Sequence, residues 1–462
     1  MSDLRNAVKN TYLPDENPPF PKLLLYAFQQ ILVMFPATVA VALITGFPVS
    51  TTIFSCGLAT ICFILITRRK VPLFCGSSFA YMSAIIGLVT AQGYESVNGI
   101  LPVDAIRVAQ FGIIMSGLVS VIAGLIVKAS GTGVVNKLLP PCVTGAISIV
   151  IGLSLAGNAM TDVVQSASDN SLSWTIAMLT FFSAVMLATY CKGLISQVPL
   201  LLAALIGCGC ALVIYWISGG EHNLFRSISN DVFANSLWML GDGSVFALPQ
   251  FSFPKASLEA VVAIMPIALA TIPESVAHVY QLDIYVNELA KKSGSPKSFK
   301  IKEMLAENLI GDGCSDMICG LIGGPAGTSY GENMSTMLIS KVFSISVLVT
   351  ASVILMILSC VTPLIKIIYC IPLAVIGGLE IYLFGAIAVQ GIAILIQSNC
   401  DVFSNRNVAV IASILIIGLG GSYAFGGAIP FFGMNIPAIA GASVFGILLN
   451  FVLGMKSPNR TE

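Results

Sequence analysis

Apolar residues run along this chain in long blocks that short polar segments separate. A membrane-spanning helix needs about 20 mostly apolar residues, and blocks of this kind recur along the chain. The pattern predicts an all-α polytopic membrane protein with about 14 transmembrane segments. Their expected positions are residues 22–45, 48–67, 72–90, 107–127, 138–157, 172–191, 197–218, 257–279, 303–323, 328–340, 343–363, 368–393, 407–422 and 434–453.

The two halves of the chain resemble each other at an offset of roughly 230 residues. Segment 35–40 matches segment 265–270. Gly76–Ala80 in the third span matches Gly327–Gly331 in the tenth at an offset of 251, because the basic loop at 280–302 adds residues. Seven spans per half is an odd number, so the two repeats must be inverted in the membrane. Inverted repeats with interrupted segments at corresponding places indicate a secondary carrier whose site lies near the midplane.

Basic residues fall in alternate loops, and such loops face the cytoplasm. The basic positions are Arg68–Lys70, Lys128, Lys137, Lys192, Lys291–Lys302, Lys341, Arg406, Lys456 and Arg460. An even number of spans then places both termini inside. The expected division is a tail at 1–21, a first repeat at 22–218, an extracytoplasmic loop at 219–256, a second repeat at 257–453 and a tail at 454–462.

Composition supports a membrane protein and excludes several other classes. Of 462 residues, 56% are hydrophobic and 10% are charged, whereas soluble domains carry about 25% charged residues. The formal net charge is zero, so no basic stripe indicates nucleic-acid binding. The 12 cysteines are scattered through apolar runs, and with only two histidines we expect no metal site. The polar, proline-containing first twenty residues predict no cleavable signal peptide.

Glu274 and His278 are the first candidates for chemistry. Ionisable residues inside membrane spans are costly and mark functional sites. The two residues are four positions apart in the eighth span, so they share one helical face, and Pro273 loosens the turn beside them. A carboxylate and an imidazole so placed can share or pass a proton near neutral pH. The alternatives are a buried structural pair, or a span that ends earlier and leaves both in the cytosolic loop.

Glu332 lies in the interrupted tenth segment, where Gly331 lets the backbone approach a ligand closely. A planar heterocycle with imide groups would match one carboxylate plus free backbone amides. Glu332 can accept the imide N–H groups, while main-chain N–H groups near Phe79 and Gly331 meet the carbonyl oxygens. Phe79 and Tyr330, at equivalent repeat positions, could bracket the ring. The alternative is that these helix breaks serve packing alone.

Asp312 and Glu380 are further carboxylates inside predicted spans. The Ile310–Gly313 segment is similar to half of an intramembrane aspartyl protease, which needs a second Asp on another span. Asp316 lies one turn away on the same helix and cannot supply it, so a gating or helix-end role is favoured for Asp312. Glu380 either lines the pathway or pairs with a polar group.

Several segments closely resemble the nucleobase–ascorbate transporters, a family of nucleobase:cation symporters, and above all its bacterial uracil permeases. The central segments are Cys75–Tyr81, Glu274 with His278, and Tyr330–Asn333. Further matches lie at Phe35–Thr38, Gly131–Gly133, Ile371–Pro372 and Gly377–Gly378. The resemblance runs nearly end to end. It implies fourteen spans in two inverted repeats, a core domain and a gate domain, and short strands in segments 3 and 10.

Carried over by position, the resemblance implies a substrate site between segments 3 and 10. Glu274 and Glu332 would hold the base, and His278 would join Glu274 in proton coupling. The remaining substrate-binding candidates are Phe79, Gly331, Tyr330, Ala37 and the adjoining Ser78, and the gating candidates are Asp312, Glu380 and Phe384. The resemblance also implies a homodimer, no cofactor beyond the co-transported ion, and an inner-membrane location.

The chain departs from the family pattern at a few positions that bear on the base carried and on proton stoichiometry. Glu332 at the head of the signature is similar to uracil carriers, whereas xanthine and urate carriers more usually have Gln. Ser335 replaces a Gly of the signature, and Phe384 replaces a Tyr. Ser275 and Gln30 stand where uracil permeases have His.

These observations predict a proton-coupled uracil symporter that works by alternating access, with Na⁺ as an alternative co-ion. The competing carriers are a xanthine or purine permease of the same family and an anion exchanger on the same fold. From other classes, a channel and an intramembrane protease stay open. Saturable uptake that collapses with an uncoupler would argue against the channel, and the missing second Asp argues against the protease. The expected protein is therefore not an enzyme.

Overall fold

The computed structural model describes residues 11–97, 99–131, 140–164, 170–193, 195–227, 238–240, 245–432 and 434–455. Most of the Gly131–Gly133 match, the basic residues Lys137, Lys456 and Arg460, and parts of the 219–256 loop lie outside this range.

The first half of the chain folds into helices with one short strand. Its elements are α2 (Phe20–Thr45), α3 (Val49–Ile66), β1 (Cys75–Ser77), η1 (Phe79–Tyr81), α4 (Met82–Ala91), α5 (Val103–Ser130), α7 (Pro141–Ser154), α8 (Ala156–Val164), α9 (Asn170–Tyr190), η2 (Ile195–Gln197) and α10 (Pro199–Ile217).

The second half likewise places a short strand directly before a short helix, and it has additional short strands. It contains β2 (Trp238–Leu240), β3 (Leu248–Pro249), α12 (Leu258–Ile264), η3 (Met265–Ile267), α13 (Ala268–Lys292), η4 (Ile301–Met304), α14 (Leu305–Ile322), β4 (Gly327–Ser329), α15 (Gly331–Ser340), α16 (Ile345–Leu358), α17 (Thr362–Tyr369), α18 (Leu373–Gln397), α19 (Asn405–Ala424), β5 (Ala428–Phe431), β6 (Met434–Pro437) and α20 (Ala438–Met455).

Nine helices among the described residues are long and apolar enough to cross a membrane. They comprise α2, α3, α5, α7 with α8, α9, α10, α12 with α13, α18 and α19. Shorter apolar helices lie at Phe79–Ala91, Ile345–Leu358 and Ala438–Gly454.

Several helices differ in extent from the predicted spans. The helix of the eighth segment continues past residue 279 to Lys292, so Glu274 and His278 lie well inside a helix rather than in a loop. The fifth segment extends to Val164. The fourteenth begins at Ala438, because residues 434–437 pair as β6 with β5. The β2–β3 and β5–β6 pairs were not predicted, since such short strands carry no period of their own.

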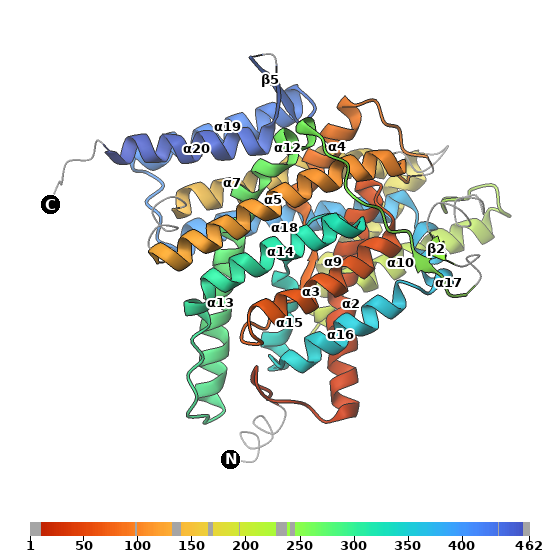
Figure 1. Ribbon diagram of the computed structural model, residues 1–462. Helices are drawn as coiled ribbons and strands as arrows, with labels where there is room; N and C mark the ends of the chain where they lie inside the picture. The colour runs from red at the N-terminus through yellow and green to blue at the C-terminus, as the bar shows by residue number, and fades with distance from the viewer. Residues whose placement is uncertain are drawn as a thin grey trace.

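The helices pack in two groups. The first contains α2, α3, α5, α14 and α16, and the second contains α18 with α7, α8, α9 and α10, together with α19 and α20. Figure 1 shows α2, α3 and α16 side by side, with α19 and α20 along the opposite edge. In the first group α5 meets α14 closely: a Cβ on Gly117 would lie 2.5 Å from the Gly313 carbonyl oxygen. Small residues allow this contact between membrane helices.

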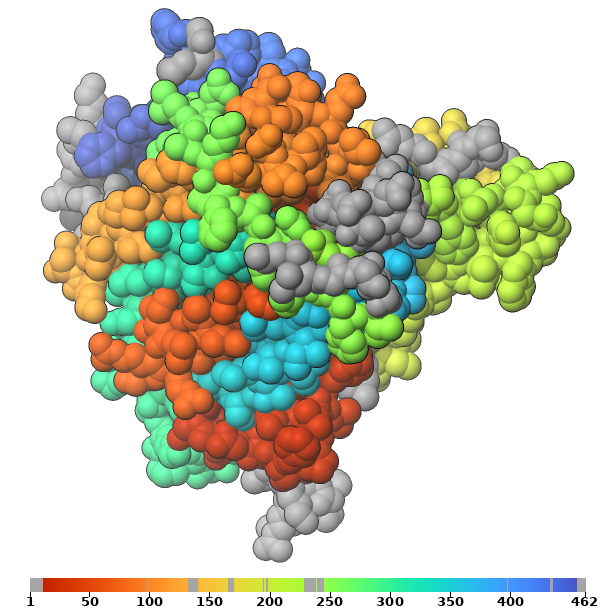
Figure 2. Space-filling view, turned by 45° about the vertical axis from the view of Figure 1, so that its right-hand side comes forward, coloured from red at the N-terminus to blue at the C-terminus, as the bar shows by residue number. Residues whose placement is uncertain are grey.

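The outer surface of the helices is apolar. Trp216 and Ile217 at the end of α10 are 71% and 83% exposed, and α9, α18 and α19 also carry exposed Phe, Ile and Val side chains. Figure 2 shows the yellow-green residues around α10 projecting from the body. Apolar surface of this extent indicates contact with lipid rather than water.

Basic residues of distant segments gather at one end of the helices. Lys128 at the end of α5 lies 3.6 Å from Glu307 at the start of α14. Lys297 pairs with Asp15, and the Tyr12 amide donates to the Lys341 carbonyl at 3.0 Å. The 245–255 segment lies at the opposite ends of these helices. There the Ala247 amide donates to the Cys360 carbonyl after α16, and the Ser252 amide donates to the Ile322 carbonyl at the end of α14.

Candidate functional site

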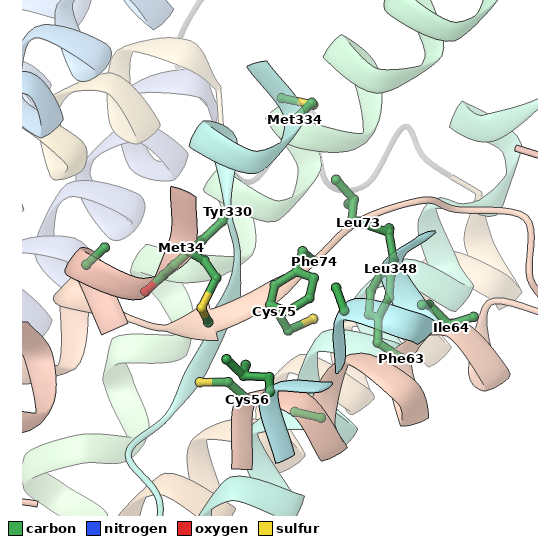
Figure 3. Packing of buried hydrophobic residues seen from close by; sticks show 14 of the residues in the cluster. Met34, Cys56, Phe63, Ile64, Leu73, Phe74, Cys75, Tyr330, Met334 and Leu348 are labelled. Atoms are coloured by element: carbon green, nitrogen blue, oxygen red, sulfur yellow. The ribbon is translucent and has the colours of Figure 1, made fainter. Parts of the chain in front are cut away.

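The site is built where the two interrupted segments cross. Strands β1 and β4 pair antiparallel, with Cys75 opposite Ser329, Gly76 opposite Thr328 and Ser77 opposite Gly327. Each strand leads directly into a short helix, α4 after β1 and α15 after β4. Figure 3 shows the buried residues around this crossing, among them Met34, Cys75 and Tyr330. Two helix N-termini therefore meet at one place within the fold.

Tyr330 connects β4 to β1 and to α2 at this crossing. Its hydroxyl donates to the Ser77 carbonyl at 2.8 Å and lies 3.1 Å from the Thr38 hydroxyl of α2. Its ring passes over Gly76, where a Cβ would lie only 2.3 Å from ring carbons. The Tyr330 ring is thus held against the strand, and whether it and Phe79 bracket a ligand ring stays a prediction.

A cavity of about 420 Å³ opens beside the crossing. Its lining combines residues of α2, η1, α13, β4, α15 and α18, so both helix groups contribute to it. The predicted site residues on its wall are Ser78, Phe79, Glu274, His278, Tyr330, Gly331 and Glu332. Six of the seven predicted substrate residues thus share this cavity. The exception is Ala37, which is 2% exposed and packs in the core one turn beyond the lining residue Val33.

One face of α13 forms a polar stripe along the cavity. Glu274, His278 and Gln281 follow one another at helical spacing, and all three line the wall. The His278 Nδ1 lies 2.9 Å from the Ser329 hydroxyl of β4, while its Nε2 has no partner among the described residues. A Cβ on Gly331 would lie 3.3 Å from that Nε2. His278 thus spans from α13 to the β4–α15 junction.

Glu332 stands in the first turn of α15 and is exposed, because its side chain faces the cavity. The N-terminal N–H groups of a helix have no partner within the helix and carry partial positive charge. The N-termini of η1–α4 and α15 have no side-chain cap at Ser78 or Tyr330. The cavity is therefore faced by the backbone N–H donors of two helix N-termini and by two carboxylates, Glu332 and Glu274. The two carboxylates repel each other electrostatically.

Asp312 is not on the cavity wall but lies behind Glu274. Ser275, the residue after Glu274, donates to Asp312 and accepts from the Asn308 side-chain amide at 2.7 Å. This chain of bonds joins α13 to α14. Asp312 therefore anchors the helix that carries Glu274, and its gating role stays a prediction.

Asp316 has a structural position that the sequence did not predict. Its carboxylate accepts from the Gly327 amide at 2.8 Å and from the Tyr81 hydroxyl at 3.2 Å. Tyr81 in turn lies 2.7 Å from the Ser116 hydroxyl. Asp316 therefore holds the start of β4 and the end of η1 together, next to the site. The sequence signal for this position was a second acidic residue inside the same apolar span, four positions after Asp312.

The remaining gating candidates lie on α18. Phe384 is buried and meets the Phe79 ring edge to face, with centroids 5.9 Å apart. Glu380 is fully buried and does not line the cavity. The cavity wall of α18 instead carries Gln390, whose amide nitrogen would lie 3.9 Å from a Cβ on Gly331. Gln390 and Gln281 were missed, although an amide inside an apolar span was a usable signal.

Comparison with known proteins identifies the family. The sequence profile of the Permease family matches residues 21–427. The chain is 32% identical to the uracil permease of Bacillus caldolyticus over 444 residues, covering 95% of this chain and 93% of that one. It is 31% identical to the uracil permease of Escherichia coli K12, with 97% and 95% covered.

Solved structures share the fold at low identity. The inward-facing murine solute carrier 26 family member A9 anion transporter aligns with a TM-score of 0.65 at 11% identity, over 94% of this chain and 68% of that one. The transmembrane domain of the cyanobacterium bicarbonate transporter BicA aligns with a TM-score of 0.57 at 14% identity, over 96% and 99%. With an apolar outer surface and these relatives, the chain is a multi-pass integral membrane protein that belongs to the Permease family.

Proposed function

We propose that this protein is a secondary active transporter that carries a nucleobase, with uracil as the leading substrate, together with a proton. The observation that carries the proposal is the pairing of Glu274 and Glu332 with two uncapped helix N-termini around one cavity. A uracil edge alternates N–H donors with carbonyl acceptors. Carboxylates can accept the former while backbone N–H groups donate to the latter. The names of the uracil permease relatives support the same substrate.

The proton is expected to bind at Glu274. Two carboxylates facing one space repel each other, so a proton on one of them stabilises the loaded site. His278, one turn away with a free Nε2, can exchange that proton with Glu274. Na⁺ in place of H⁺ is the alternative co-ion. No described residue that lines the cavity is Lys or Arg, which argues against the alternative of an anion exchanger.

For the architecture we propose fourteen segments in two inverted repeats, with a core domain of segments 1–4 and 8–11 and a gate domain of the others. The equivalent places of β1–α4 and β4–α15, and the antiparallel pairing of the two strands, support this division. The first packing group holds helices of segments 1, 2, 4, 9 and 11 and the second holds those of segments 5–7 and 12–14, which supports the same division. Alternating access then follows from movement of one group past the other, across a cavity that both line.

The gathering of Lys128, Lys297 and Lys341 at one end supports cytoplasmic termini in a bacterial inner membrane. A homodimer is proposed from the family resemblance. A xanthine or purine permease is the second candidate substrate class, and the cavity volume accommodates either kind of ring.

The test measures thermal stabilisation of the purified protein by uracil and by xanthine. A ligand that binds only the folded state raises the melting temperature. We expect uracil to stabilise the wild type and to lose this effect in Glu332→Gln, while Glu288→Gln, a surface carboxylate, binds normally. Stabilisation by xanthine alone would move the protein to the purine carriers. No response to either base would refute the nucleobase site.

The coupling is tested in proteoliposomes with Glu274→Gln. This variant keeps the shape of the side chain but cannot release a proton. We expect it to lose uphill uracil accumulation driven by a proton gradient while retaining exchange of labelled for unlabelled uracil. Unchanged accumulation would show that Glu274 does not carry the coupled proton.

A further inference from the structure

Glu380 is the most anomalous carboxylate of the described chain. It sits in the first third of α18, is 0% exposed, and neither of its carboxylate oxygens has a hydrogen-bond donor among the described residues. A buried ionised carboxylate is normally paired with a charge or with donors. Glu380 lies outside the substrate cavity, so the transport mechanism above does not use it.

The group that faces Glu380 is another carboxylate, Asp162 of α8. The two helices touch at this level: a Cβ on Gly377, one turn before Glu380, would lie 2.8 Å from the Val163 amide nitrogen and 3.1 Å from the Ala159 carbonyl oxygen. The Asp162 and Glu380 carboxyl groups are within hydrogen-bonding reach of each other. Two ionised carboxylates are both acceptors, so they can bond only when one of them carries a proton.

One positive charge is present nearby. Arg226, in the segment after α10, acts electrostatically on Asp162. Its Nη1 is buried without a partner among the described residues, and its Nη2 packs over Gly99. The other helices that pack against α18, namely α7, α9 and α10, contain no charged residue. One arginine can balance one carboxylate, and these helices supply no counter-charge for the second carboxylate among the residues that the structure describes.

We propose that Asp162 and Glu380 hold one proton between them, with Arg226 as the counter-charge, as a proton site separate from the Glu274–Glu332 cavity. The shared proton satisfies both carboxyl groups and makes the trio electrically neutral. Two carboxylates in one low-dielectric site share a proton in this way because they cannot both ionise. The bond ties α8 to α18.

This proton stays in place during transport. None of the three residues lines the cavity, so the shared proton lies off the substrate site; Glu380 is fully buried and Asp162 is half-buried. The shared proton therefore forms a pH-sensitive hydrogen bond between two helices of the proposed gate domain, because its loss would leave two adjacent negative charges. The existence of this proton site does not depend on which solute is carried. Only the claim that the proton stays bound through the transport cycle rests on the proposed function.

The first test is infrared difference spectroscopy of the purified protein. The carbonyl band of a protonated carboxylic acid should appear in the wild-type minus Glu380→Gln difference at neutral pH and vanish at alkaline pH. Asp162→Asn should also remove the band, because the Asn amide can donate to Glu380 and let it ionise. The surface variant Glu288→Gln should show no such band. Absence of a protonated-acid band in both the Glu380→Gln and the Asp162→Asn differences would overturn the proposal.

The second test follows the melting temperature from neutral to alkaline pH. The wild type should lose thermal stability as the shared proton leaves, and Glu380→Gln should lose clearly less. Equal loss in both proteins would contradict the proposal. Retention is tested in proteoliposomes, where Glu380→Gln should leave the number of protons per uracil unchanged. A lower ratio would mean that this proton is transported, whereas failure of the nucleobase proposal would remove uracil uptake but leave the infrared band.

Discussion

The ring of Tyr330 lies directly across Gly76, so close that a single added methyl group would overlap it. The two residues belong to equivalent segments of the two halves of the chain. Their contact fixes how far β4 can approach β1, and with it the positions of the two helix ends that line the cavity.

Gly76→Ala is therefore expected to disturb the site. The new Cβ would lie 2.3 Å from the Tyr330 ring, and overpacking of this kind costs about 1–3 kcal/mol. The melting temperature and uracil binding should both fall. Gly87→Ala is the matched control on α4, where a Cβ meets nothing within 4 Å and a helical Gly to Ala change is stabilising by about 0.5–1 kcal/mol. Equal stability of the two variants would contradict the contact.

Tyr330→Phe tests the hydroxyl separately from the ring. It removes the donor to the Ser77 carbonyl and the contact with Thr38 in a buried setting, and an unsatisfied buried group costs about 1–3 kcal/mol. Tyr423→Phe is the control, since the Tyr423 hydroxyl bonds to the Leu153 carbonyl at 2.6 Å on a residue that is 58% exposed. Chemical denaturation should show a clearly smaller loss for the control.

The Phe79–Phe384 contact joins the two helix groups across the cavity wall. A double-mutant cycle with Leu at each position should give a coupling of about 0.5–1.5 kcal/mol in the free energy of unfolding. As a control, the same cycle for Phe79 and Phe54 should give additive changes in the free energy of unfolding, because Phe54 contacts Phe251 instead. A coupling near zero for Phe79 and Phe384 would mean that the two rings do not hold the groups together.

Gln390 should contribute to affinity rather than to stability, because it is exposed on the cavity wall opposite Gly331. Loss of one net hydrogen bond in Gln390→Ala should weaken uracil binding by about 2- to 12-fold, from 0.5–1.5 kcal/mol. The melting temperature without ligand should not change. Gln92→Ala, which removes a surface contact with Glu259, should bind uracil normally in the same calorimetric titration.

Sequence reasoning located the site because its signals are local. Gly76–Ser78 and Gly327–Ser329 interrupt apolar runs, and Glu274 and Glu332 stand out as charges within them. The structure places both carboxylates on one cavity wall. What each neighbour does was harder to predict. The role of Tyr330 depends on the register of β1 against β4, and no periodicity in either segment encodes that register.

The same limit applies to partners that are distant in sequence. Glu380 could be recognised as a buried carboxylate, but the partner Asp162 lies on another helix whose end was expected seven residues earlier. The Ser275–Asp312 bond likewise depends on how α13 crosses α14. The β5–β6 hairpin was missed because an apolar stretch near a span end is typical of helix as well as of strand.

The three-residue pairing of Cys75–Ser77 with Gly327–Ser329 also has a consequence for biosynthesis. The first strand is made early, yet its partner leaves the ribosome only when more than two thirds of the chain has been translated. Until then β1 and the start of α4 have unpaired backbone groups and no cavity exists. The substrate site therefore cannot form from the first half alone, and it is completed only after β4 has been made.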